Sequence, residues 1–194
     1  MGKRFVSIWF CHLATDWFLL RQPGLRNKAF VLKTALHGKM LVTATNELAE
    51  AQGIYTGMAI ADARAIFPSL EALDDIPGLE NKLLHRIAEW CIRFTPVVSV
   101  DLPGGLLLDV TGCTHLWGSD ELYIAAIAEK FREHGYAIRV AMAGTIGAAW
   151  AVARYGKNNF VIGHNQQTTA LLSLPAASLR LEQGIVEQLG KLGL

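Results

Sequence analysis

The sequence predicts an α+β fold in which helices cover one face of a mainly antiparallel sheet and leave the other face open. Three observations favour this fold. The chain has 194 residues, of which 52% are apolar and 18% charged, as expected of a globular protein with a sizeable core. Segments of high β-propensity alternate with segments of helical period. Their order is a split β-α-β layout that carries an inserted group of strands and helices.

The first part of the chain is predicted to begin with a buried strand over residues 4–11 (RFVSIWFC). A short helix over 15–21 follows, and Thr15 or Asp16 is expected to cap it, because either side chain can accept a hydrogen bond from the first turn. The inserted elements are strands 28–32 and 40–45, joined across His37 and Gly38, and helices 46–52 and 57–68.

The second part is predicted to alternate helices with strands around a central hairpin. Residues 79–94 have a clear 3.6-residue apolar period, and a helix over 119–134 is expected to start from an N-cap at Ser119. The remaining elements are a strand over 136–144, an alanine-rich helix over 145–156 that ends at Gly156, a short strand over 159–163 and helical structure from about residue 168.

The hairpin over 99–112 (SVDLPGGLLLDVTG) carries two aspartates, and Pro103, Gly104 and Gly105 supply its turn. The predicted register pairs three sets of apolar residues: Leu102 with Leu106, Val100 with Leu108, and Val98 with Val110. Asp101 and Asp109 then lie on the opposite face as diagonal neighbours about 7–8 Å apart. They are either an acidic metal site, or the remnant of one, or two solvated side chains at the end of a hairpin.

The net charge gives little information about binding partners, whereas the cysteines indicate the cellular compartment. The net charge of +1 is not that of a chain whose main task is to bind phosphates. The three cysteines lie far apart without a CxxC pair, and the apolar start FVSIWF is too short for a membrane span or a signal core. We therefore expect a soluble cytoplasmic protein without membrane contact.

Three segments in order resemble the Y-family (translesion) DNA polymerases. NELAEAQGIYTGMAIADARAIFP resembles their fingers motif, VVSVDLPGGLLLDVTG their palm hairpin, and IRVAMAGTIGAAWAVARYG the strand and helix that follow it. The resemblance covers about residues 1–175. It implies a ferredoxin-like palm over 1–28 and 76–165, a fingers insertion over 29–75, and the start of a truncated helical thumb over 166–194.

The chain departs from this family at the positions that hold the catalytic metals. The family's first strand ends in an Asp-x-Asp pair, which falls here on Trp9 and Cys11, and neither residue type suits Mg²⁺. In the hairpin the family has an adjacent Asp-Glu pair. Counted from the start of the hairpin, Asp101 keeps the aspartate and Leu102 replaces the glutamate; counted back from Asp109, the pair falls on Gly104 and Gly105. Neither count leaves the pair intact, so Asp101 and Asp109 are the only residual candidates for metal binding.

The positions that contact the triphosphate in the family are also changed. A fingers tyrosine and arginine fall on Glu47 and Glu50, and a palm-helix lysine falls on Ala149. A glutamate in place of an arginine repels a ligand of charge near −4 instead of attracting it. The resemblance therefore implies no nucleotide site, no catalytic residues and no cofactor. We expect the bulky Trp9 to pack into the space that metals and nucleotide would otherwise fill.

This pattern is similar to a catalytically inactive branch of the family found in bacterial mutagenesis cassettes. The resemblance implies a non-catalytic scaffold for DNA-damage-induced translesion synthesis, recruited to the nucleoid on damage. Its implied partners are an error-prone replicative-type DNA polymerase, a RecA-like accessory protein and the sliding clamp, mostly through regions C-terminal to this sequence. Primer-template DNA is a further candidate partner. Two alternatives stay open: an active nucleotidyltransferase with Mg²⁺ on Asp101, Asp109 and Asp16, and a plain DNA-binding module.

Overall fold

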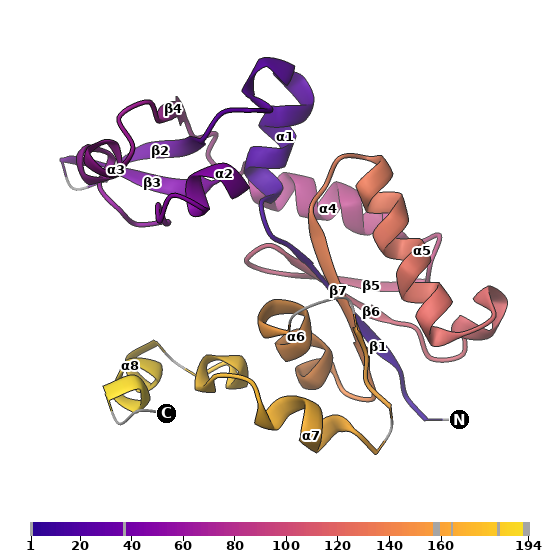
Figure 1. Ribbon diagram of the computed structural model, residues 1–194. Helices are drawn as coiled ribbons and strands as arrows, with labels where there is room; N and C mark the ends of the chain where they lie inside the picture. The colour runs from indigo at the N-terminus through magenta and orange to yellow at the C-terminus, as the bar shows by residue number, and fades with distance from the viewer. Residues whose placement is uncertain (1, 37, 157–159, 164, 182, 192–194) are drawn as a thin grey trace. The chain divides into compact units, whose positions relative to one another are not determined.

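The chain forms two compact units, and each is described by itself. The large unit consists of residues 1–11, 84–134 and 138–194, and the small unit of residues 12–83 and 135–137. Figure 1 shows the computed structural model, which describes residues 2–36, 38–156, 160–163, 165–181 and 183–191. The small unit contains the predicted insertion over 29–75 and also the first helix of the chain.

The large unit is built on a five-stranded sheet of order β5-β6-β1-β7-β8. Its strands are β1 (Phe5–Phe10), β5 (Val97–Asp101), β6 (Gly105–Asp109), β7 (Ile138–Ala143) and β8 (Phe160–Val161). β1 pairs antiparallel with both β6 and β7, β5 pairs antiparallel with β6, and only β7 and β8 are parallel. The predicted α+β class and the mainly antiparallel sheet are confirmed.

Alternation along β1 assigns the two faces of this sheet. Val6, Ile8 and Phe10 are buried on one face, where the ring of Phe10 lies 5.2 Å from that of Phe131 in α5 (Asp120–Glu133). Trp9 points to the other face and packs against the alanine-rich cluster formed by β7 and α6 (Ile146–Tyr155). Helix α6 therefore covers part of the face that the sequence predicted to be open.

Local sequence signals set the ends of the helices. The Ser119 hydroxyl accepts the backbone N–H of Leu122 at the start of α5, and the Thr145 hydroxyl accepts that of Ala148 at the start of α6. The predicted helices over 119–134 and 145–156 are confirmed, as is that over 79–94, which forms α4 (Leu79–Cys91). A single turn of 3₁₀ helix, η2 (Thr114–Trp117), precedes α5.

The first helix differs from its prediction, because α1 (Leu13–Arg21) begins before Thr15 and Asp16 and neither residue caps it. Both side chains are buried and bonded elsewhere. The Thr15 hydroxyl donates to the carbonyl of Thr45, and the Asp16 carboxylate accepts the backbone N–H of Ala137 at 2.9 Å. Neither side chain accepts a hydrogen bond from the first turn of α1: Asp16 bonds to Ala137, and the Thr15 hydroxyl lies within hydrogen-bond distance of the carbonyls of both Thr45 and His12.

The small unit holds a three-stranded sheet of order β3-β2-β4. Its elements after α1 are η1 (Pro23–Leu25), β2 (Phe30–Leu36), β3 (Lys39–Thr45), α2 (Glu47–Glu50), α3 (Ile60–Ile66) and β4 (Glu71–Asp74). The predicted strand pair is confirmed, although His37 of its predicted turn lies outside the described residues. Strand β4, parallel to β2, occupies an acidic stretch in which the sequence predicted no strand.

The last part of the chain packs beside α6 as three short helical segments. These are α7 (Gln167–Leu172), η3 (Ala176–Leu179) and α8 (Gln183–Lys191). Helical structure was predicted from about residue 168, and these segments confirm it. Within the described ranges, no helix is both long and apolar enough to cross a membrane.

Candidate functional site

One row of residues crosses the large sheet and contains the positions that the sequence singled out. Asp101 on β5 lies opposite Gly105 on β6, Gly105 opposite Trp9 on β1, and Trp9 opposite Arg139 on β7. All four residues belong to the face on which α6 packs. The sheet thus places an acidic, a very small, an aromatic and a basic residue side by side.

The hairpin register differs from the predicted one by two residues. Asp101 pairs with Gly105 and Val97 with Asp109, so the turn consists of residues 102–104 and Gly105 is part of a strand. The two aspartates share a face, as predicted, but lie at opposite ends of the hairpin, about 14 Å apart along the strands at 3.4 Å per residue. The expectation that they are diagonal neighbours is wrong.

The tip of the hairpin explains this register. The carbonyl of Gly104 accepts the backbone N–H of Phe10 at 2.8 Å, which fastens the turn to the end of β1, and Gly104 itself has a φ of +65°. Asp109, at the other end, uses its carboxylate to accept the backbone N–H of Thr111 at 3.0 Å. Hydrogen bonds from the side chain and then the backbone of Thr111 lower the pKa of Asp109, and both are local turn contacts.

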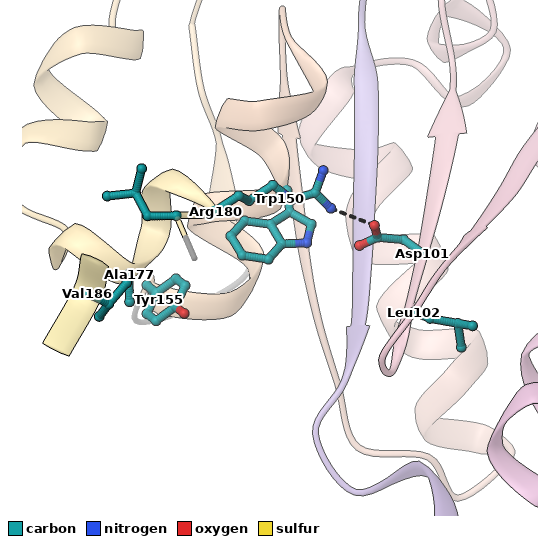
Figure 2. A pocket seen from close by; sticks show the side chains of 8 residues that line it. Asp101, Leu102, Trp150, Tyr155, Ala177, Arg180 and Val186 are labelled. Carbon is teal, nitrogen blue, oxygen red and sulfur yellow. Dashed lines mark hydrogen bonds and ion pairs between the residues drawn. The ribbon is translucent and has the colours of Figure 1, made fainter. Parts of the chain in front are cut away.

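Two arginines hold the Asp101 carboxylate. Arg180, which directly follows η3, donates from Nη2 to Oδ1 at 2.5 Å (Figure 2). Nη2 of Arg154 on α6 lies 3.3 Å from Oδ2. The side chains of Asp101 and Arg154 are only 12% and 9% exposed, whereas that of Arg180 is 41% exposed. We call these three residues the Asp101 clamp.

Packing fixes the inner half of the clamp. Arg154 also donates to the carbonyl of Pro103 at 2.7 Å, so the guanidinium spans the hairpin tip. A Cβ atom on Gly105 would lie 3.0 Å from Nη2 of Arg154 and 3.0 Å from the backbone oxygen of Asp101, which explains why glycine stands at this strand position. Burial lowers the pKa of Arg154, and the charge of Asp101 opposes that effect.

Trp150 on α6 lies beneath both cations of the clamp. The guanidinium carbons of Arg154 and Arg180 lie 4.6 and 4.3 Å from the centre of its ring, a geometry of cation–π attraction. In Figure 2 the indole nitrogen is on the side of the ring that faces Asp101. The residual acidic side chain is thus surrounded by positively charged groups of the protein itself.

Trp9 lies at the centre of the row. Its ring packs against the α6 cluster, and the Arg139 guanidinium lies 4.3 Å from the ring centre. Arg139 is held in place because it donates to the carbonyls of Gly156, at 2.8 Å, and of Arg154. Cys11 follows β1 and is half-buried, and Leu102 is exposed at the hairpin tip.

The positions aligned with triphosphate contacts carry no cationic side chain. Glu47 and Glu50 lie on α2 of the small unit, where Glu50 accepts the Thr45 hydroxyl at 3.1 Å and approaches His12 at 3.7 Å. Ala149 is fully buried in the cluster on α6. Glu50 is therefore engaged in hydrogen bonding and Ala149 in packing, and Glu47 contributes a negative charge.

These residues do not fit a Mg²⁺ ion. Mg²⁺ requires several hard oxygen ligands in octahedral geometry, whereas Trp9, Cys11 and Leu102 offer none and Asp101 already faces two guanidinium groups. Asp16 is engaged within the small unit, where burial raises its pKa to about 6. In the described part of the chain, no three His, Cys, Asp or Glu side chains are grouped as a metal site.

Comparison with known proteins assigns this geometry to a family. The family model described as impB/mucB/samB matches residues 8–154, which include the hairpin, α5 and α6. The chain belongs to the impB/mucB/samB family. Protein ImuB of Caulobacter vibrioides is 39% identical to this impB/mucB/samB chain over 142 residues, or 73% of the chain and 31% of that relative. DNA polymerase IV of Moorella thermoacetica is 29% identical over 114 residues, 57% of the chain and 28% of the relative.

Solved structures agree on the fold. DinB from Sulfolobus solfataricus matches with a TM-score of 0.79 at 18% identity, over 98% of this chain and 57% of that one. An insertion ternary complex of Dbh DNA polymerase matches with a TM-score of 0.81 at 18% identity, over 98% and 58%. The resemblance to Y-family polymerases and to ImuB is confirmed, and this impB/mucB/samB chain spans about a third of the curated relatives' length.

Sequence reasoning missed the partners of Asp101. Arg154 and Trp150 are four residues apart on the predicted helix over 145–156, so their common face was readable from the sequence. Nothing local identified Arg180, which is 79 positions from Asp101 and follows a 3₁₀ turn in a segment of weak pattern.

Proposed function

We propose that this impB/mucB/samB chain is a non-catalytic, polymerase-like scaffold that acts in translesion synthesis after DNA damage. The observation that carries the proposal is the Asp101 clamp. A two-metal mechanism requires carboxylates that are free to bind two cations about 4 Å apart. Here the one retained carboxylate is paired with Arg154 and Arg180. The resemblance to Y-family polymerases implies that Trp9 stands at a position where the active members carry a second carboxylate.

The alternative of a relocated metal site finds little support. It requires Asp101, Asp109 and Asp16 to converge, but Asp101 and Asp109 lie at opposite ends of the hairpin. Asp16 bonds to the backbone of Ala137 in the small unit. A metal on Asp101 alone would first have to displace two guanidinium groups.

Primer extension tests the proposal. We expect no incorporation of nucleotides by this chain on a primed template with Mg²⁺ or Mn²⁺, and Asp101→Ala should not differ from the unchanged protein. An active Y-family polymerase serves as the positive control. Incorporation that Asp101→Ala abolishes would refute the scaffold and favour the nucleotidyltransferase.

The partners and the location follow from the family and are part of the proposal. We expect the protein to act in the cytoplasm, at the nucleoid after damage, with an error-prone replicative-type polymerase, a RecA-like accessory protein and the sliding clamp. Binding to primer-template DNA is a separate question that a salt titration answers. A plain DNA-binding module would bind duplex DNA at low salt and lose affinity steeply as salt is added.

A further inference from the structure

A groove of about 610 Å³ lies next to the Asp101 clamp, within the large unit (Figure 2). Four aliphatic side chains line it, from Leu102, Ala177, Leu181 and Val186. Trp150 and Tyr155 of α6 add two aromatic rings. The groove is therefore mainly apolar, with the clamp forming its polar part.

The charge of the groove is unbalanced. Two guanidinium groups share one carboxylate, which leaves one net positive charge at its polar part. The buried Arg154 serves Asp101, whereas Arg180 is 41% exposed and lines the groove. Among the described residues, Arg180 bonds through Nη2 alone. A guanidinium has five N–H donors, so Arg180 can donate to a second carboxylate while it stays bonded to Asp101.

Arg180 is held in a fixed orientation. Its guanidinium rests 4.3 Å from the centre of the Trp150 ring, and its backbone adopts the left-handed conformation, with a φ of 58°. Among the described residues it is the only non-glycine with positive φ. Such conformations are uncommon outside glycine and gather at functional sites. A preoriented donor also loses less entropy when it binds a ligand.

We propose that this groove binds a short peptide of a partner protein, with one acidic side chain on Arg180 and flanking aliphatic side chains against Leu181 and Val186. This inference rests on the proposed scaffold function, because a scaffold requires surfaces for partners. The lining favours a peptide over nucleic acid, since a phosphate backbone is bound by many cations and this groove presents one exposed arginine. Aliphatic anchors around a single charge-assisted bond match a peptide motif.

A random dodecapeptide display library, selected on the immobilised chain, supplies the ligand. We expect enrichment of sequences with one Glu or Asp between Leu, Ile or Val residues. The best peptide is then fluorescently labelled, and its affinity is measured by anisotropy beside a version with the acidic residue changed to its amide. A twelve-nucleotide thymidine oligomer, labelled in the same way, forms the nucleic-acid arm.

Variants assign the binding to the groove. Arg180→Gln and Val186→Asp should each weaken peptide binding at least tenfold, as should the amide peptide. Arg132→Gln, which changes an exposed arginine paired with Glu129 on α5, is the matched control and should bind normally. Thermal melting of each variant verifies that it is folded.

Three outcomes overturn the inference: no enriched peptide family, peptide binding that Arg180→Gln leaves unchanged, or Arg180-dependent binding of the oligomer in place of the peptide. The assay contains no nucleoside triphosphates or metal ions. A positive primer-extension result would refute the scaffold, whereas the peptide assay alone decides the groove, so the two failures are distinguishable.

Discussion

Changing Asp101 to asparagine distinguishes a structural carboxylate from a catalytic one by the sign of its effect on stability. Carboxylates gathered to bind metals repel one another, so neutralising one of them commonly stabilises the protein. Asp101 instead offsets the charges of Arg154 and Arg180, and Arg154 is only 9% exposed. The Asp101→Asn variant would leave a buried guanidinium without its counter-ion, and we expect the protein to lose stability.

The expected magnitude follows from the burial of the pair. Removing one partner of a buried ion pair costs ~3–5 kcal/mol. Arg154 would keep its bond to the Pro103 carbonyl at 2.7 Å, and Arg180 can turn to water, so the low end applies. A loss of about 3 kcal/mol corresponds to a fall in Tm of about 6–12 °C for a chain of this size. Urea unfolding followed by tryptophan fluorescence, together with calorimetry, measures both quantities.

Asp109→Asn is the matched control, because it lies on the same hairpin and face and an asparagine can still accept the Thr111 N–H. Its effect should stay within about 0.5 kcal/mol. A double-mutant cycle with Arg154→Met should give a coupling energy of about 1–3 kcal/mol with Asp101. An Asp101→Asn variant as stable as the unchanged protein, or more stable, would refute the structural role of this carboxylate.

Three further predictions concern packing and protonation. Gly105→Ala should lower the free energy of unfolding by about 1–3 kcal/mol, because its Cβ would meet Arg154. Gly147→Ala in α6, with no atom within 4 Å of its Cβ, should be neutral or stabilising by up to about 1 kcal/mol. Equal effects of the two substitutions would contradict this prediction. Burial raises the pKa of Asp16 from 3.8 to about 6, so the folded state binds this proton more tightly and stability is lost as pH rises between these values. In Asp16→Asn this loss of stability, about 3 kcal/mol, should be absent. The free energy of unfolding of both proteins is measured at pH 4 and pH 7.5, and an equal pH dependence in the two proteins would disprove the prediction. Asn46→Ala should destabilise the small unit by about 2 kcal/mol in urea unfolding, because Asn46 caps α2 and also bonds the backbone of β2, and a change below about 0.5 kcal/mol would contradict this.

Most elements of the fold could be predicted because their signals are local. Ser119 and Thr145 cap α5 and α6 through neighbours three residues away, and the alternation of β1 separates its two faces within six residues. Strand β4 was missed because two of its four residues, Glu71 and Asp74, are acidic, and only its parallel pairing with β2 identifies it. The start of α1 was misplaced because distant backbone groups bind Thr15 and Asp16.

The candidate site divides in the same way. The sequence by itself determined that Trp9 and Leu102 stand at positions that the resemblance aligns with the carboxylates of a polymerase, and no coordinates were needed for that expectation. The tertiary structure alone decided the hairpin register, because PGG allows more than one closure and the bond from Phe10 to Gly104 selects one. Only the tertiary structure shows that Arg180 bonds to Asp101, which is 79 positions away in the sequence. A carboxylate's partners depend on how distant segments pack, and no short stretch of sequence records that packing.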